Sequence, residues 1–160
     1  MSDPTHAEVT LHVPRGGIPM GVVAAVGSSH GLPEAMLTSE ARHILLVGGR
    51  IVLSSDDADG GRINNWNARE WSQHLDGIDV DATWCQGTDY VPGSEHVRAG
   101  ALHAYAEMDG EPVLTLRRLV ELREQGKSLD EAIDALLTTP VAYETGDLET
   151  EVDLSPGSPP

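Results

Sequence analysis

The sequence predicts a single α+β domain with a mixed or mostly antiparallel sheet of about five strands and two or three helices, including a C-terminal helical hairpin. Three observations predict this class. The length of 160 residues is that of one ordinary domain. Several short segments alternate apolar with polar residues, which is typical of half-buried strands. Near the C-terminus, apolar residues recur at helical spacing instead.

The N-terminal segment contains two expected strands. Residues 6–13, HAEVTLHV, place Val9, Leu11 and Val13 on one face and polar residues on the other. The unbroken apolar run MGVVAAV at 20–26, bounded by glycines, predicts a central strand.

Residues 33–53 have two interpretations. Pro33 in a first turn and helical spacing up to Gly48 predict a helix, followed by the strand RIVLS at 50–54. Alternatively, HILLV and RIVL are the two strands of a hairpin with Gly48 and Gly49 as its turn. Both interpretations fit the sequence.

The middle of the chain alternates loops with short elements. SSDDADGGRINN at 54–65 and CQGTDYVPGSE at 85–95 are expected loops. Between them, NAREWSQHLDG predicts a short helix with Asn67 as N-cap and Gly77 just past its end, and IDVDATW at 78–84 predicts a strand. In ALHAYAEMDGEPVLTL at 101–116, Asp109 and Gly110 favour a hairpin over a helix.

Two helices around a Gly-Lys-Ser turn are expected over 115–139. Ser128 and Glu131 form a capping box, and an apolar stripe follows it: Leu129, Ala132, Ile133, Leu136 and Leu137. The first helix should direct Leu116, Leu119 and Val120 inward and end at Gly126. We expect Ile133 and Leu136 to lie in the core or in a dimer seam. From Gly146 onward, residues 146–160 should form an acidic, proline-rich flexible tail after a domain spanning 1–145.

LRRLVELREQGKSLDEAIDALL, residues 116–137, resembles the later helical pair of MerR-type regulators, which follows their DNA-binding helices. The resemblance covers 22 of 160 residues, and the groove-reading half has no counterpart upstream. The second helix would present Asp130, Glu131 and Asp134 to phosphates. We therefore interpret the pair as a packing or dimerisation unit, and a DNA-binding regulator is the weakest functional hypothesis.

The net charge of −16 disfavours nucleic acid and anionic membranes as partners and favours a basic protein. A homodimer is a second partner expectation. One lysine against nine arginines also suits a GC-rich or salt-adapted genome, in which the acidity would carry no information about partners. With one cysteine, no apolar run long enough to span a bilayer and no signal-peptide pattern, a cytoplasmic protein is expected.

The candidate catalytic residues are few. VGSSHG at 26–31 follows an expected buried strand, and its Gly27–Gly31 loop offers Ser29 and His30 without matching a nucleophile or nucleotide motif. Cys85 with His96 or His103 as its base would form a second site. The histidines lack the tight spacing of zinc ligands, so we expect no metal and no cofactor.

The candidate binding residues surround the first loop. Trp66, Asn65 and Arg69 have the composition of an interface anchor, although Trp66 fits the aliphatic core equally well; Trp71 is expected to cap that core. The acidic residues of this loop are Asp56, Asp57 and Asp59. As a calcium loop from Ser55, the segment fails at its last ligand position, which is Trp66.

Two main hypotheses of function follow. The first is a small, acidic, non-catalytic binding or regulatory protein, such as an immunity-like, antitoxin-like or accessory subunit that acts through protein–protein contacts. The second is a small enzyme whose site lies near Cys85, His96, His103 and the Gly27–Gly31 loop.

Overall fold

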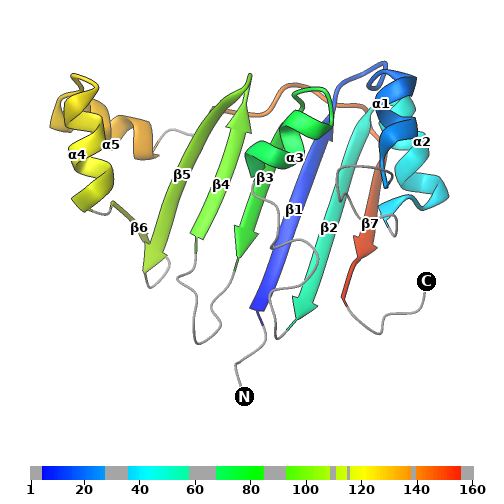
Figure 1. The fold of residues 1–160 in the computed structure, drawn as a ribbon, viewed down its shortest axis with the longest axis horizontal. Helices are drawn as coiled ribbons and strands as arrows, with labels where there is room; N and C mark the ends of the chain where they lie inside the picture. The colour runs from blue at the N-terminus through cyan, green and yellow to red at the C-terminus, as the bar shows by residue number, and fades with distance from the viewer. Residues whose placement is uncertain are drawn as a thin grey trace.

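The computed structural model describes residues 5–27, 36–57, 68–84, 93–108, 111–114, 116–137 and 140–155. These residues form a single α+β domain built on a mixed, mostly antiparallel sheet, as predicted (Figure 1). The strands are β1 (Thr5–Val13), β2 (Gly49–Asp57), β3 (Asp79–Trp84), β4 (Gly93–Arg98), β5 (Ala101–Met108), β6 (Glu111–Val113) and β7 (Glu149–Asp153). The helices are α1 (Met20–Ala25), α2 (Ser39–Val47), α3 (Ala68–His74), α4 (Leu116–Glu124) and α5 (Leu129–Leu137).

In the described part of the chain the sheet has seven strands in the order β6-β5-β4-β3-β1-β2-β7. Neighbouring strands are antiparallel, except that β2 and β7 are parallel. The sheet is larger than the sequence predicted, because β4 and β7 lie in segments that were expected to be a loop and a tail.

The core lies between the sheet and helices α1, α2 and α3, which cover one of its faces (Figure 1). The alternation predicted for β1 is confirmed, since Val9, Leu11 and Val13 are buried on the covered face. Trp71 of α3 is completely buried in this core, as expected. Burial of a side chain of this kind stabilises the fold by about 1.5–3 kcal/mol.

Residues 20–26 were expected to be a central strand, and this prediction is wrong. Met20–Ala25 form helix α1, which begins after Pro19. Met20 is 73% exposed while Val23 is buried, so the run has one buried side and not two. A short apolar run has no period that distinguishes a buried strand from a helix, and packing on the sheet decided the outcome.

Of the two interpretations of residues 33–53, the helix followed by a strand is confirmed and the hairpin is wrong. Helix α2 begins after Thr38, whose Oγ1 accepts a hydrogen bond from the Ala41 amide at 3.2 Å. The helix ends at Gly48, where φ is +106°, and an added Cβ would lie 2.5 Å from the Pro14 carbonyl oxygen. Glycine is therefore required at this turn. Pro33 lies outside the described residues.

The two expected loops, at 54–65 and 85–95, are shorter than predicted, because the first begins within β2 and the second ends within β4. Ser54–Asp57 continue β2, and Gly93–Glu95 belong to β4, while residues 58–67 and 85–92 lie outside the described part of the chain. The helix and strand predicted between them are confirmed as α3 and β3. Asn67, the predicted N-cap, is not described; the carboxylate of Glu95 accepts a hydrogen bond from the first amide of α3, at Ala68, at 3.0 Å.

Two hairpins join β4, β5 and β6. The predicted hairpin is confirmed, because Met108 pairs with Glu111 on either side of Asp109–Gly110, which are not themselves described. A second hairpin was not predicted. Ala99 and Gly100 connect β4 to β5 with φ values of +50° and +81°, as a two-residue hairpin turn requires.

The C-terminal helical hairpin is confirmed as α4 and α5. Glu131 N donates to Ser128 Oγ at 3.2 Å and Ser128 N donates to Glu131 Oε2 at 3.0 Å, which is the predicted capping box. The predicted inner face is partly wrong, since Leu122 and Ala132 are buried whereas Leu116 and Ile133 are 76% and 40% exposed. The side chains of Leu136 and Leu137 lie outside the described part of the chain.

The flexible tail predicted from Gly146 is wrong for residues 146–155. Glu149–Asp153 form β7, which pairs with β2 at the edge of the sheet. Val152 and Leu154 are 6% and 2% exposed. These two apolar residues within an acidic segment stabilise the added strand. Residues 156–160 lie outside the described part of the chain.

No helix in the described ranges is long and apolar enough to cross a lipid bilayer.

Candidate functional site

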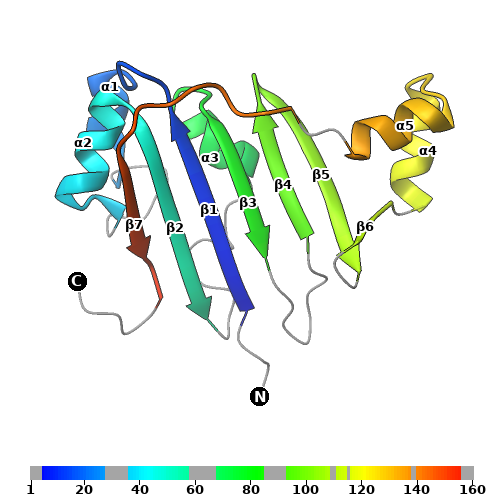
Figure 2. The same cartoon turned by 180° about the vertical axis from the view of Figure 1, so that it is seen from behind.

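The other face of the sheet carries polar side chains and, in the described residues, no helix lies over strands β1 to β4 (Figure 2). Residues 140–148, which lead from α5 to β7, cross one end of this uncovered face (Figure 2). The polar face follows from the period of two along each strand. Leu11 of β1 and Val80 of β3 point toward the helices, so the residues before and after each of them point toward the uncovered face. Antiparallel pairing sets Thr10 beside Asp81, Asp81 beside His96, and His96 beside His103. A polar row therefore crosses four strands.

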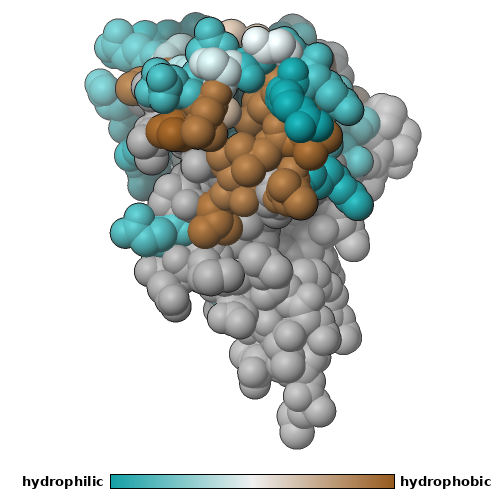
Figure 3. All heavy atoms as spheres, turned by 90° about the vertical axis from the view of Figure 1, so that its left-hand side faces the viewer, coloured by the Kyte–Doolittle hydropathy of each residue, from teal (hydrophilic) through white to brown (hydrophobic). Residues whose placement is uncertain are grey.

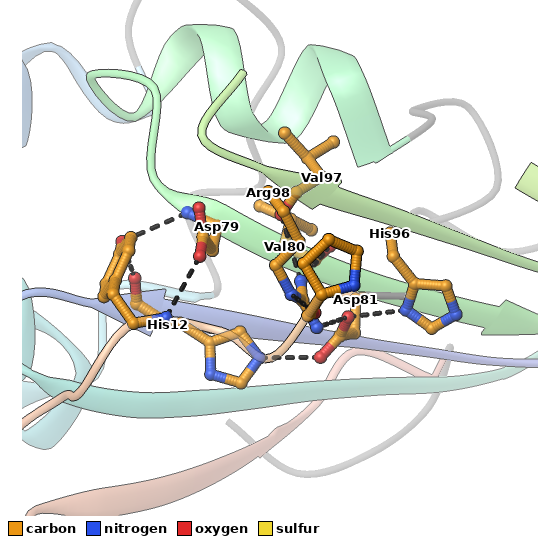
Figure 4. A network of polar contacts seen from close by, with 9 residues as sticks. His12, Asp79, Val80, Asp81, His96, Val97 and Arg98 are labelled. Carbon is orange, nitrogen blue, oxygen red and sulfur yellow. Dashed lines mark hydrogen bonds and ion pairs between the residues drawn. The ribbon is translucent and has the colours of Figure 1, made fainter. Parts of the chain in front are cut away.

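Asp81 of β3 lies at the centre of this row and accepts three side-chain hydrogen bonds (Figure 4). His12 Nε2 lies 2.7 Å from Asp81 Oδ2. His96 Nδ1 and Arg98 Nη2 each lie 2.6 Å from Asp81 Oδ1. The side chains are mostly buried, from 10% exposed for Arg98 to 25% for Asp81. One carboxylate thus joins strands β1, β3 and β4.

The charge of Asp81 is stabilised by its neighbours. Burial by itself would raise the pKa of this carboxyl, but the hydrogen bonds from His12, His96 and Arg98 outweigh it and hold the pKa far below the ordinary value of 3.8. An ionised carboxylate only accepts hydrogen bonds, so His12 Nε2 and His96 Nδ1 must each carry a proton. The network therefore fixes the orientation of both imidazole rings.

A second carboxylate, Asp79, fixes the chain that crosses the uncovered face. Its Oδ1 accepts from the Ala99 amide at 3.0 Å, and its Oδ2 accepts from the Tyr143 amide at 3.2 Å. The Tyr143 hydroxyl accepts from the Asp79 amide at 3.1 Å and donates to the carbonyl oxygen of His12. Burial, together with the nearby Asp79 charge, raises the pKa of Tyr143 to about 12. Tyr143 therefore stays protonated and keeps donating at neutral pH.

Arg98 links Asp81 to the segment that crosses the uncovered face. Besides its contact with Asp81, its Nε donates to the carbonyl oxygen of Pro140 at 2.8 Å, and its Nη1 donates to that of Val97 at 3.0 Å. The guanidinium thus binds the strand, the carboxylate and the crossing segment at once. The planar fork of donors on arginine suits such a junction, whereas a lysine ammonium does not.

The structure brings together two of the five catalytic candidates. His96 and His103 are cross-strand partners on the uncovered face. Burial lowers the pKa of His103 below 6.5, and the charges of His96, Arg98 and Lys127 lower it further, so its ring is neutral at pH 7. Cys85, Ser29 and His30 lie outside the described residues, and of the Gly27–Gly31 loop only Gly27 is described.

The binding candidates that the structure describes do not lie together. Arg69 is exposed on α3, on the helix-covered side, and Asp56 and Asp57 lie in β2, where they pair with His6 and Thr5 of β1. Trp66, Asn65 and Asp59 lie outside the described part of the chain. Of the calcium-loop positions, Ser55 is buried in β2.

Sequence reasoning missed most of the network. His12, Asp79 and Asp81 occupy the polar positions of strands that the alternation predicted, so their common face was available from the sequence. The pairing of these strands could not be predicted, because His12 and Asp81 are 69 residues apart in the sequence. Arg98 and Tyr143 lay in segments for which no strand contact was expected.

What the cluster can do chemically is limited by its internal bonding. Asp81 is occupied by three donors, and in the described residues no group of three His, Cys, Asp or Glu side chains is arranged to hold a metal ion. The Nδ1 of His96 is held by a carboxylate, as in an oriented general base, but its Nε2 is buried from solvent. Comparison of the chain with protein families, curated proteins and solved structures gives no match.

Proposed function

We propose that this protein is a small, acidic, non-catalytic binding or regulatory protein that uses the uncovered sheet face to contact a basic partner protein. The observation that carries the proposal is the set of exposed carboxylates on the strands of that face: Glu8, Glu151 and Asp153, with Glu149 beside them in an ion pair with Arg50. Immunity proteins, antitoxins and accessory subunits are the classes that such a contact fits.

The register gathers these carboxylates. Ser54 of β2 pairs with Glu8 of β1 on one side and with Asp153 of β7 on the other, so the two carboxylates flank one small residue. Glu151 lies beside Val52 in the next row of the same face. An acidic surface attracts a basic partner over about 10 Å at an ionic strength of 0.1 M and accelerates its association.

The cluster around Asp81 supports this proposal by its own bonding. The three donors of the cluster are directed at Asp81, so they do not compensate Glu8, Glu151 and Asp153, whereas Arg50 compensates Glu149. A network of this kind stabilises a flat, rigid surface. Rigid surfaces lose little conformational entropy on binding.

A charge-matched pair of variants tests the proposal. The face variant combines Glu8→Gln, Glu151→Gln and Asp153→Asn, and the control variant combines Glu40→Gln, Asp76→Asn and Glu124→Gln, which are exposed elsewhere. Affinity purification from the native host with quantitative mass spectrometry should recover a basic protein with wild type and control, and lose it with the face variant. Equal recovery with both variants, or no stoichiometric basic protein, would contradict the proposal.

A second candidate function is that of a small enzyme, and it rests on the 2.6 Å contact between His96 and Asp81. In this hypothesis, Asp81 orients His96 as a general base on the uncovered face, beside the neutral His103. A panel of chromogenic ester, phosphate and amide substrates tests it. Turnover that His96→Gln abolishes and His43→Gln leaves unchanged would establish the enzyme, whereas identical background rates would exclude these reactions.

A further inference from the structure

The end of the molecule formed by α4 and α5 exposes a patch of apolar side chains. Leu116 of α4 is 76% exposed, and Leu129 and Ile133 of α5 are 66% and 40% exposed, with Leu119 and Val120 half-buried between them and the core side. Figure 3 looks onto this end and shows hydrophobic residues gathered in one patch with hydrophilic residues around it. We call these five residues the α4–α5 patch. Contiguous apolar surface of this kind marks an interaction site.

The charge around the patch differs from that of the remaining chain. Residues 116–137 contain four basic and five acidic residues, for a net charge of −1 within a chain of −16. Two copies of this protein therefore repel each other over most of their surfaces, but not here. This near-neutral apolar end is therefore a part of the described surface that a second copy can approach at low electrostatic cost.

The balance of charge also differs between the helices, because α4 carries three arginines and two glutamates whereas α5 carries three carboxylates and no basic residue. Arg117 and Arg123 lie on α4, where Arg123 is seven residues from Leu116 and shares its side of the helix. Asp130 and Asp134 lie on α5, each directly after an exposed apolar residue, and their spacing of four aligns them along one flank of the stripe. Helix α4 thus has a net charge of +1 and α5 a net charge of −3.

We propose that the α4–α5 patch binds a second copy of this chain, with α4 of each copy against α5 of the other. A two-fold contact makes the same patch serve both copies. A contact of α4 with α4 would bring the arginines of the two copies together. Charge complementarity therefore favours contact between α4 of one copy and α5 of the other.

This surface is separate from the one that the proposed function uses. The patch lies beyond β5 and β6 at one end of the sheet, whereas the carboxylates of β1, β2 and β7 lie toward the other end (Figure 1). The self-association can therefore hold while the basic partner is bound, and neither proposal depends on the other. A symmetric pair would present two acidic faces.

Light scattering of the full chain after size exclusion, at micromolar concentrations, tests the patch. Wild type should be a dimer, and Leu116→Glu with Leu129→Glu should raise the dissociation constant by about 100-fold or more, since charges placed in an apolar seam lose both packing and solvation. Met20→Glu is the matched control, because Met20 is 73% exposed on α1 at the other end of the sheet. A monomeric wild type, or a dimer that survives the double change, would overturn the proposal.

A charge exchange tests the pairing of α4 with α5 and does not depend on apolar changes. Arg117→Glu with Arg123→Glu, and Asp130→Lys with Asp134→Lys, should each be monomeric and retain wild-type circular dichroism. A mixture of the two variants should form a heterodimer, because α4 of the first now carries the charge that α5 of the second complements. If both variants stay folded and monomeric but never combine, the arrangement is wrong.

Discussion

At the scale of single residues, Asp81 is the carboxylate that holds three donors of the polar network together. We expect Asp81→Asn to lower the free energy of unfolding by about 1–3 kcal/mol, between the values typical of exposed and fully buried ion pairs. The amide fills the same space but leaves Arg98 without its anion. Urea denaturation measures the change. Glu151→Gln, exposed on the same face, is the control, and equal midpoints for the two variants would contradict a stabilising role for Asp81.

His103 determines a pH dependence of stability. Its pKa in the folded state is lowered below 6.5, so the unfolded chain takes up the proton first and stability is lost as pH falls through 6.5 toward the lowered value. Asp81 adds nothing in this range, because its stabilisation is present above 3.8 and is lost only as pH falls below that value.

We therefore expect the wild type to lose melting temperature relative to His103→Gln as pH falls from about 7.5 to about 5.5. Differential scanning calorimetry of both proteins across this range measures the difference. His43→Gln, exposed on α2, should keep the wild-type slope. A His103→Gln variant with the full wild-type slope would assign the pH dependence to another group.

At the scale of elements, β7 turns an acidic segment into part of the sheet. Leu154, which follows the strand, is 2% exposed, so we expect Leu154→Ala to cost about 2–4 kcal/mol. Glu151→Ala, exposed within the same strand, should change stability by less than about 0.5 kcal/mol. Chemical denaturation compares the two. A chain that ends at Leu148 should be strongly destabilised, and a melting temperature within a couple of degrees of wild type would show that β7 contributes nothing.

At the scale of the whole molecule, the net charge of −16 opposes compactness. Raising the ionic strength from about 0.01 M to about 0.1 M shortens the screening length from about 30 Å to about 10 Å. We expect the melting temperature to rise by about 2–4 °C, which corresponds to roughly 1 kcal/mol for a chain of this length. The variant with Glu8→Gln, Glu151→Gln and Asp153→Asn should gain less. An unchanged melting temperature across this range would show that self-repulsion does not lower the stability of the fold.

The sequence by itself determined the features that depend on a few neighbouring residues. The faces of β1 and β3 followed from the alternation around Leu11 and Val80, and the start of α5 followed from Ser128 and Glu131. The hairpin between β5 and β6 followed from its turn dipeptide. Periodicity and capping act within one or two turns of chain, so a single sequence contains all the information that they need.

Only the tertiary structure decided the features that depend on distant partners. Met20–Ala25 became a helix because one side, with Val23, packs into the core beside α2, and β7 became a strand because β2 offered an unpaired edge to Val152. The polar network needed β1, β3 and β4 in that order, and strand order is set by the packing of the whole core and not by any local pattern. His12, Asp81 and Arg98 therefore met at a point that no stretch of the sequence encodes alone.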